Sequence, residues 1–577
     1  MSDNTRPGDR PALAASLLVD EERAQALRRQ SLAFQSLTLS QRQLCDLELL
    51  LNGGFAPLDG FMDRTAYERV LDDARLPSGA LWPMPVVLDV DASVAEKLEP
   101  GQPLALRDQE GFMPAVLTVS EVWEADKARE AVAVYGTESA DHPGVRYLQG
   151  RVQNFYVAGR LQGIQLPAHH DFESLWNTPE ELRHQFVKTG WRNVLAFQTT
   201  NPIHKLQRRV VVDAAKAHQA HILIHPAVGE TKPGDLHYYA RVRCYKAMAR
   251  HLPHEMTALS LLPLAMRMAG PREALWHALV NRNYGCTHIL IGPDHGSPPP
   301  GGDATGRFYP RYAAQEYVQS FGDEPGIQVA PVPEHRYVPS KQSFLPAQRI
   351  ENEEMESLSL SPAELRALLL QNKEVPDWFS YPEVLAELRR VYPPPSRQGI
   401  TLFFTGLSGS GKSTLANIIY AKLVEAGGRP VSLLDGDIVR RNLSSELGFS
   451  KAHRDLNIRR IGFVASEITK NGGVAICAPI APYTETRRAV REMIEAHGAF
   501  IEIHVSTPLD ICESRDRKGL YAKARKGLIP EFTGISDPYE VPAHPELRID
   551  TSGLSPTEAA QDILLYLFKE GYLDEEA

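Results

Sequence analysis

The segment Gly406–Ser413 constrains this chain more than any other part of its sequence. Its residues, GLSGSGKS, fit the pattern G-x-x-x-x-G-K-[ST] of a phosphate-binding loop. Residues 400–405 before it are mostly β-branched or aromatic and predict a buried strand, and apolar residues recur at helical spacing from Leu415 to Leu423. A strand, a glycine-rich loop and a helix in this order present backbone N–H groups and a helix N-terminus to phosphate oxygens. The sequence therefore predicts a nucleoside triphosphate site, with ATP as the expected ligand.

The residue types in this loop predict separate roles. Lys412 can reach the β- and γ-phosphates, and the Ser413 hydroxyl can bind Mg²⁺. Mg²⁺ is expected only together with ATP, and no structural metal is expected. The predicted ATP and Mg²⁺ contacts are Gly406, Ser408, Gly409, Gly411, Lys412, Ser413 and Thr414.

Length and composition describe a protein of several domains. A chain of 577 residues is too long for one hydrophobic core. No apolar run approaches the ~18–20 residues needed to cross a bilayer, and the polar N-terminus does not resemble a signal peptide. Five scattered cysteines without a C-x-x-C pair are typical of a cytoplasmic protein with reduced thiols. With a net charge of −10, we expect neither nucleic acid nor membrane as a partner.

The hydrophobic pattern divides the chain into three regions. Residues 1–170 predict a β-rich domain, with apolar runs at 85–88 and 115–119. In residues 171–390, predicted strands alternate with helices, which is typical of a parallel α/β domain. Residues 398–577 follow a proline-rich linker and predict a second α/β domain with a parallel sheet, whose expected strands are 400–405, 430–435, 474–478 and 500–505.

Two carboxylates follow the second expected strand of the last region. Asp435 and Asp437 come directly after it, and the carboxyl ends of parallel strands face the crevice where ligands bind. One carboxylate can order Mg²⁺ through water, and the other can accept a proton from an attacking hydroxyl. Asp-Gly-Asp is elsewhere often a simple turn, but its position after the phosphate loop favours catalysis. We therefore predict Asp437, Asp435 and Lys412 as catalytic residues.

The motifs of residues 398–577 resemble those of adenylylsulfate (APS) kinases. They lie at 406–414, 435–440, 447–449, 453–460, 479–483, 518–521 and 532–535. The resemblance implies a P-loop kinase that phosphorylates the 3′-hydroxyl of adenosine 5′-phosphosulfate from MgATP, which yields PAPS. It implies that Asp437 is the base and that Asp435 supports the Mg²⁺ water shell. It assigns APS binding to Asp437, Arg440, Phe449, Arg454, Asn457, Ile480, Lys518 and Phe532.

This resemblance carries further expectations for single residues. Phe449 and Phe532 are expected to sandwich the substrate adenine, and Lys518 to belong to a mobile lid. Ala481 stands where many members of the family have a serine linked to a phospho-enzyme, so a phosphoserine intermediate at this position is excluded. Members of the family form homo-oligomers, and we expect one here.

The first two regions resemble ATP sulfurylases, which join sulfate to ATP and release pyrophosphate. The resemblance rests on residues 52–62, 198–204, 232–235, 266–273 and 283–288. It implies a PUA-like N-terminal domain and a central Rossmann-like nucleotidyltransferase domain. ATP would then be a substrate of this part of the chain as well.

The sulfurylase patterns Gln-Thr-Arg-Asn-Pro-x-His-x-x-His and Gly-Arg-Asp-His are incomplete in this chain. Thr200 replaces the first Arg, Gln207 the second His and Pro293 the second Arg. Loss of one transition-state cation commonly lowers a rate by ~10²–10³, so we expect an inactive or severely impaired sulfurylase. The degenerate site predicted here comprises Gln198, Thr200, Asn201, His204, Gln207, Pro293 and His295.

Three alternatives stay open at this point. The chain could be a fully bifunctional enzyme that makes PAPS from sulfate. Residues 1–390 could instead be a non-catalytic scaffold or a nucleotide-binding regulator of the kinase. The kinase could also act on a nucleotide other than APS. Assays of both half-reactions separate the first alternative from an isolated kinase activity.

Overall fold

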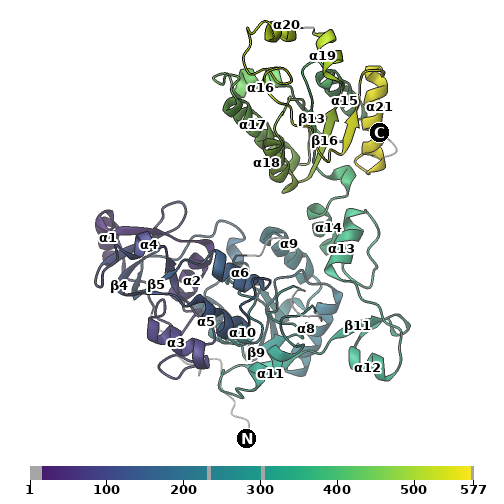
Figure 1. The fold of residues 1–577 in the computed structure, drawn as a ribbon. Helices are drawn as coiled ribbons and strands as arrows, with labels where there is room; N and C mark the ends of the chain where they lie inside the picture. Colours follow the sequence, from purple (N-terminus) through teal and green to yellow (C-terminus); the bar gives the residue numbers. More distant parts are fainter. Residues whose placement is uncertain (1–15, 231–235, 300–305, 517, 574–577) are drawn as a thin grey trace. The chain divides into compact units, whose positions relative to one another are not determined.

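A computed structural model describes residues 16–230, 236–299, 306–516 and 518–573, apart from the side chain of Asp437. The chain forms two compact units, Met1–Leu360 with Pro376–Leu388, and Ser361–Val375 with Arg389–Ala577 (Figure 1). Among the described helices, none is both long enough and apolar enough to cross a membrane. The predicted domain limits at 170, 390 and 398 remain predictions.

The first unit begins with a five-stranded sheet in the order β1-β3-β4-β5-β2. Only β1 and β3 pair in parallel; the other neighbours are antiparallel. The predicted strand at 85–88 is wrong except for its last residue, because Pro85 has no N–H group for a strand ladder. The strands are β1 Gln35–Thr38, β2 Leu88–Val90, β3 Pro103–Arg107, β4 Ala115–Glu124 and β5 Phe155–Gly163, and the helices α1 Glu21–Gln30, α2 Gln41–Leu51, α3 Arg64–Asp73, α4 Ala92–Ala95, α5 Lys127–Tyr135 and α6 Pro143–Gly150.

The first unit continues with a parallel five-stranded sheet in the order β10-β9-β6-β7-β8, which confirms the α/β layout. Its strands are β6 Val194–Phe197, β7 His221–Ile224, β8 Thr257–Leu259, β9 His288–Ile291 and β10 Gln328–Pro331. Its helices are α7 Pro179–Lys188, α8 Lys205–Ala217, α9 Tyr238–Ala249, α10 Pro271–Asn283 and α11 Ala313–Gln319. The hairpin β11 His335–Val338 and β12 Ser343–Pro346 and the helix α12 Ala347–Asn352 follow in the first unit. Helix α13 Pro362–Leu370 belongs to the second unit, and α14 Pro382–Val391 contains the limit between the units after Leu388.

One hydrophobic core runs through both regions of the first unit. Phe55, from the glycine-rich segment 52–62, is fully buried between Trp82 and Trp276. Its ring centroid lies 5.6 Å from that of Trp82 and 5.2 Å from that of Trp276. This segment is therefore a packing element that joins the β-rich region to the α/β region.

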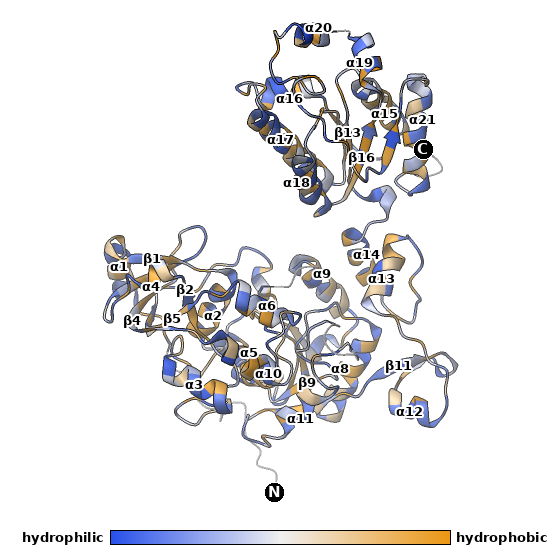
Figure 2. Cartoon of the chain, viewed as in Figure 1, coloured by the Kyte–Doolittle hydropathy of each residue, from blue (hydrophilic) through white to orange (hydrophobic). Residues whose placement is uncertain are grey.

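The second unit is a parallel sheet in the order β14-β15-β13-β16-β17. Leu402 and Phe404 face a core with α15 and α21, and Phe403 faces a core with α17 and α18. The sheet's strands are largely hydrophobic, whereas α18 is largely hydrophilic (Figure 2). The strands are β13 Ile400–Thr405, β14 Val431–Leu434, β15 Val474–Cys477, β16 Ala499–Val505 and β17 Leu547–Ile549. The helices are α15 Lys412–Ala426, α16 Gly436–Leu443, α17 Lys451–Lys470, α18 Thr484–Glu495, α19 Leu509–Arg515, α20 Leu520–Arg525 and α21 Pro556–Lys569.

These elements confirm the four strands predicted for this unit. Strand β17 was not predicted, because Leu547–Ile549 contains only three residues and shows no readable alternation. The order of the strands places the phosphate loop after the central strand, β13, between the ends of β15 and β16. This edge of the sheet is where parallel α/β proteins bind ligands.

Candidate active site

The phosphate loop adopts a backbone that only glycine accepts easily at three positions. Gly406 has a φ of 148°, Gly409 a φ of 76° and Gly411 a φ of 105°. A Cβ atom at Gly409 would lie 2.9 Å from the carbonyl oxygen of Cys512. The loop therefore needs glycine at Gly409 both for its left-handed conformation and for its close approach to α19.

Lys412, the first residue of α15, is buried at 6% exposure. Its Nζ donates hydrogen bonds to the carbonyl oxygens of Gly406 at 2.9 Å and Leu407 at 2.7 Å. Burial lowers the pKa of this ammonium group to about 8. Ser413 and Thr414 follow on the exposed side of the helix start. The loop thus presents a lysine, a hydroxyl group and a helix N-terminus together, as phosphate binding requires.

Side chains from distant parts of the sequence form hydrogen bonds with the backbone of the phosphate loop. The hydroxyl groups of Thr507 and Thr551 donate to the Ser410 carbonyl at 3.1 and 3.0 Å. The Tyr521 hydroxyl donates to the Ser408 carbonyl at 2.8 Å. No pattern around these three residues signals this role, because each bonds to the backbone of the loop across a long sequence separation.

The two predicted carboxylates lie at the carboxyl end of β14. Asp435 directly follows this strand, and its carbonyl accepts the N–H of Val439 at 2.9 Å at the start of α16. Asp437 belongs to the first turn of α16, while its side chain lies outside the described part of the structure. The backbone therefore brings both positions to the ligand-binding edge of the sheet, next to the strand β15.

Arg440 and Phe449 form one predicted pair of contacts for the acceptor. The Arg440 guanidinium donates to the carbonyl oxygens of Leu447 and Gly448 at 3.0 and 3.1 Å. Its carbon Cζ lies 4.3 Å from the centroid of the Phe449 ring, and Phe449 is 66% exposed. An aromatic face held over a cation and open to solvent can stack on a planar base.

Arg454 and Asn457, one turn apart on α17, form a second pair. Arg454 Nη1 lies 2.9 Å from both the Thr533 hydroxyl and the Asp537 carboxylate, and Nη2 donates to the Tyr483 hydroxyl at 2.9 Å. The Oδ1 atom of Asn457 is buried without a hydrogen-bond partner. Buried polar groups normally have partners, so this amide oxygen is a candidate ligand contact.

Three predicted acceptor contacts come from later loops. Ile480 lies in the segment after β15, and its carbonyl accepts the N–H of Gly406 at 3.3 Å. Phe532 packs edge-to-face on Tyr521, with ring centroids 5.1 Å apart. Lys518 is exposed at the turn before α20. The structure thus brings Ile480 directly to the phosphate loop, whereas the proposed sandwich of Phe449 and Phe532 stays a prediction.

In the first unit, the sulfurylase-like residues gather at the carboxyl ends of β6 and β9. Gln198 accepts a hydrogen bond from Asn281 Nδ2 at 2.7 Å, and Gln198 Nε2 is buried without a partner. The Thr200 carbonyl accepts a hydrogen bond at 3.0 Å from Arg241, a fully buried arginine of α9. Arg241 was not predicted from the sequence, because it is one of three cations in α9, with Arg243 and Lys246, and no motif marks it as part of a site. Asn201 is exposed, and its N–H donates to the Thr199 hydroxyl at 3.1 Å.

His204 and Gln207 organise the start of α8. His204 Nδ1 lies 2.8 Å from the Ser380 hydroxyl, and its ring packs on Phe379 with centroids 4.5 Å apart. The Gln207 side chain accepts the His204 N–H at 3.0 Å and so caps the helix. Burial lowers the pKa of His204 to about 4, which keeps its imidazole neutral. Both residues are thus engaged in packing and capping.

Pro293 and His295 lie in the loop after β9. The Pro293 carbonyl accepts the Tyr312 N–H at 2.9 Å, and His295 Nε2 lies 2.9 Å from His277 Nδ1. Burial and the neighbouring His277 lower the pKa of His295 to about 3. Both nearby imidazoles of the predicted site, His204 and His295, are therefore uncharged at neutral pH.

The three cations at the start of α8 bind groups other than Thr200. Lys205 donates to the Asp377 carbonyl, Arg208 to the His251 carbonyl at 2.8 Å, and Arg209 to the Asp213 carboxylate at 2.5 Å. Thr200 does line a cavity of about 920 Å³, which also contains Arg42, Arg146 and Arg151. The cavity is large enough for a nucleotide. Its three arginines were not predicted from the sequence, because they come from the β-rich region rather than from the sulfurylase motifs.

Fold and site together define the class of this protein: a phosphate-loop kinase domain joined to an α/β domain of the nucleotidyltransferase kind. The family model of a PUA-like domain matches residues 8–166, that of ATP-sulfurylase residues 173–391, and that of adenylylsulphate kinase residues 398–550. The chain belongs to the family of proteins that combine an ATP sulfurylase domain with an APS kinase domain. The predicted family and the predicted fold class are confirmed.

Similar proteins match nearly the whole chain. The sulfate adenylyltransferases of Chaetomium globosum and Mycosarcoma maydis are each 47% identical over 559 and 558 residues, which cover 96% of this chain and 97% of each relative. The solved structure of a hexameric APS kinase from Thiobacillus denitrificans is 41% identical, with a TM-score of 0.79. The match covers 97% of this chain and 98% of that one.

Proposed function

We propose that the chain is an APS kinase that transfers the γ-phosphate of ATP to the 3′-hydroxyl of APS, and that its sulfurylase domain is inactive or severely impaired. The products are ADP, PAPS and one proton. The observation that carries the proposal is the contrast between the two phosphate sites. The kinase loop keeps its lysine, hydroxyl and glycines, whereas the other site has the neutral residues Thr200, Gln207 and Pro293 in place of two arginines and a histidine.

In the kinase, the residues divide between donor and acceptor. Lys412 would leave the loop carbonyls for the phosphate oxygens, where its charge stabilises the transferred group. Asp437 would accept the proton of the 3′-hydroxyl as the base. Arg440, Phe449, Arg454, Asn457, Ile480, Lys518 and Phe532 would bind APS. The unpartnered amide oxygen of Asn457 supports its place in this set.

Oxygen donors suited to Mg²⁺ lie at the expected place. Ser413 is exposed at the start of α15, and Asp435 directly follows β14 at the same edge of the sheet. Mg²⁺ would arrive with ATP, where it neutralises charge on the β- and γ-phosphates. Ser413 would bind it directly and Asp435 through water.

The names of similar proteins support two different proposals for the sulfurylase domain, an active one and an inactive one. The relatives from Chaetomium globosum and Mycosarcoma maydis carry the name of the sulfurylase activity, which favours a bifunctional enzyme. The full-length relative from Thiobacillus denitrificans is described only as an APS kinase, and as a hexamer. The engagement of His204 and Gln207 in helix capping supports the loss of activity here. We also propose a homo-oligomer, in which residues 1–390 serve as scaffold or regulator.

The deciding experiment assays both half-reactions on one preparation of the full chain. APS-dependent ADP release should occur at an ordinary enzymatic rate, and APS should be preferred to other nucleotide acceptors. Pyrophosphate release from ATP and sulfate should be absent or at least ~10²-fold slower than the kinase reaction. Pyrophosphate release at the kinase rate would establish the bifunctional alternative instead.

One substitution tests the catalytic assignment in the same assay. Asp437→Ala should abolish APS-dependent ATP consumption, because no other carboxylate is proposed as base. Retained turnover would remove Asp437 from the catalytic residues.

Deletion of residues 1–390 tests whether they serve as a scaffold or regulator. An unchanged oligomer size in light scattering, together with unchanged kinase kinetics, would argue against this role.

A further inference from the structure

The segment after β15, residues 478–483, lies directly against the phosphate loop. The Thr405 hydroxyl is 2.7 Å from the Ile480 carbonyl, and the Gly406 N–H donates to the same oxygen. Thr405 is the last residue of β13, and the Tyr539 hydroxyl lies 2.9 Å from its Oγ1. One side of the segment is therefore attached to the strand that carries the ATP loop.

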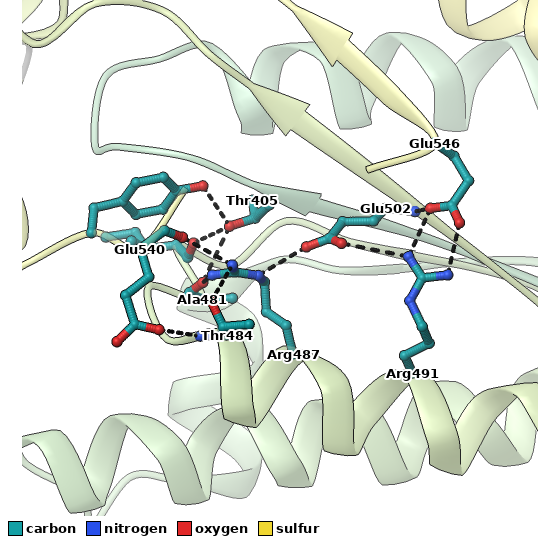
Figure 3. Close-up of polar contacts among 10 residues, drawn as sticks. Thr405, Ala481, Thr484, Arg487, Arg491, Glu502, Glu540 and Glu546 are labelled. Atoms are coloured by element: carbon teal, nitrogen blue, oxygen red, sulfur yellow. Dashed lines mark hydrogen bonds and ion pairs between the residues drawn. The ribbon is translucent and has the colours of Figure 1, made fainter. Parts of the chain in front are cut away.

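The other side of the segment is held by Arg487 of α18 (Figure 3). This arginine is 3% exposed; its Nη1 donates to the Ala481 carbonyl at 2.7 Å and its Nη2 to the Glu540 carbonyl at 2.9 Å. Ala481 is buried and has a φ of 45°. A residue with a side chain keeps this left-handed conformation only where its surroundings hold it. The bond from Arg487 is thus placed at the strained point of the segment.

Arg487 is in turn fixed by a partly buried network of charges (Figure 3). Its Nε lies 2.9 Å from one carboxylate oxygen of Glu502 on β16, and the other oxygen lies 3.5 Å from Arg491. Arg491 binds both oxygens of Glu546 at 2.7 and 2.8 Å, and Glu546 accepts the Glu502 N–H at 2.7 Å. The ion pair with Glu502 fixes the Nε side of the Arg487 guanidinium, so its Nη1 and Nη2 groups point to the carbonyl oxygens of Ala481 and Glu540.

Only arginine can make this set of contacts. Its planar fork offers five N–H donors in fixed directions, and here they donate to the Ala481 and Glu540 carbonyls and to the Thr484 hydroxyl at 3.1 Å, while Nε forms the ion pair with Glu502. Lysine could keep the ion pair with Glu502, but a single ammonium cannot reach all of these acceptors. Two of these hydrogen bonds go to backbone carbonyls, that of Ala481 in the 478–483 segment and that of Glu540. Arg487 therefore determines where the backbone of this segment lies.

We propose that Arg487 is a positioning residue for the acceptor substrate: it fixes the Ala481 carbonyl and thereby the place of Ile480 beside the phosphate loop. This inference rests on the proposed APS kinase function. The same network offers a matched control in Arg491. Arg491 shares Glu502 with Arg487, but its bonds go to Glu495, Glu502 and Glu546 on α18, on β16 and before β17. Loss of either arginine removes a cation from Glu502, but only loss of Arg487 removes a hydrogen bond from the 478–483 segment.

The test compares Arg487→Met, Arg487→Lys and Arg491→Met in the full chain, with ADP release measured at varied APS and varied ATP. Arg487→Met should raise the KM for APS about 10- to 100-fold, while kcat and the KM for ATP change by less than about threefold. Arg487→Lys should raise the KM for APS by an intermediate factor. Arg491→Met should leave both KM values within about threefold. Thermal unfolding should detect destabilisation in both methionine variants.

The inference depends on whether the KM for APS rises while the KM for ATP stays nearly unchanged. An unchanged KM for APS in Arg487→Met overturns the inference, as does an equal rise in Arg491→Met or a parallel rise in the KM for ATP. Should Arg487→Met fail to fold, Arg487→Lys retains the ion pair with Glu502, and an unchanged KM for APS in that variant is equally decisive. A wild-type protein without APS-dependent ADP release contradicts the proposed kinase function itself.

Discussion

Replacement of Lys412 by methionine should stabilise the ATP-free kinase unit and remove its phosphoryl transfer. The ammonium group is 6% exposed, and its short contacts are with neutral carbonyls of its own loop. Burial lowers the pKa of Lys412 from 10.5 to about 8, and this difference corresponds to about 3 kcal/mol of unfavourable free energy in the charged form. The hydrogen bonds lost with the ammonium group contribute about 1 kcal/mol, so the net gain in stability should be about 2 kcal/mol.

The same pKa determines how the gain depends on pH. Below pH 8, Lys412 is protonated in the folded protein and in the unfolded chain, and the full penalty is present. Between pH 8 and 10.5, the folded protein has released the proton that the unfolded chain still binds, so the free energy of unfolding of the wild type rises with pH. The advantage of Lys412→Met should therefore shrink through this window.

The assay must report on the kinase unit alone. All six tryptophans, at positions 82, 123, 176, 191, 276 and 378, lie in the first unit, so tryptophan fluorescence does not follow the second. Urea unfolding of the second unit can be followed by pulse proteolysis with subtilisin at pH 7.5 and pH 9.5. Lys422→Met is the matched control, because Lys422 lies on the same helix and its ion pair with Glu425 is exposed. The control should change stability by less than about 0.5 kcal/mol.

Two results would refute this reasoning about Lys412. The first is a Lys412→Met protein that is no more stable than wild type at pH 7.5. The second is a gain that remains undiminished at pH 9.5, since the penalty would then not arise from the buried charge. Kinase turnover should fall at least ~10²-fold in the variant, because the transferred phosphoryl group loses its cation.

Two further substitutions test the packing around the sites. Gly409→Ala should destabilise the kinase unit by about 1–3 kcal/mol and weaken ATP binding, because it adds a Cβ atom at a φ of 76° and 2.9 Å from the Cys512 carbonyl oxygen. Pulse proteolysis measures the stability, and ATP titration measures the affinity. An unchanged affinity for ATP would contradict the assigned strain. Arg267→Met should destabilise the first unit by about 3–5 kcal/mol, because Arg267 Nη2 lies 2.6 Å from the buried Asp46 carboxylate. Tryptophan fluorescence in urea reports this loss, with Arg28→Met at an exposed ion pair as the control, and equal losses in the two variants would be inconsistent with the burial argument.

Much of the kinase unit could be predicted from local patterns. The strand 400–405, the glycine loop and the helix from Lys412 appear where the sequence places them, because each is determined by neighbouring residues: β-branched runs, glycines with positive φ and apolar residues at helical spacing. Motifs of this kind also identified the family, which the comparisons confirm. The short strand Leu547–Ile549 could not be predicted, because three residues are too few to show a readable alternation, and only its pairing with β16 defines it.

The phosphate loop, the two parallel α/β regions and the three neutral replacements in the sulfurylase motif can all be read from the sequence. The groups that hold these motifs in place become visible only in the folded chain. Thr507 and Thr551 support the phosphate loop, Arg241 reaches the Thr200 carbonyl, and Arg487 holds Ala481. These contacts are hydrogen bonds from side chains to backbone atoms of distant segments. The acceptor is then a carbonyl common to every residue, so no local pattern in the sequence can reveal the pair.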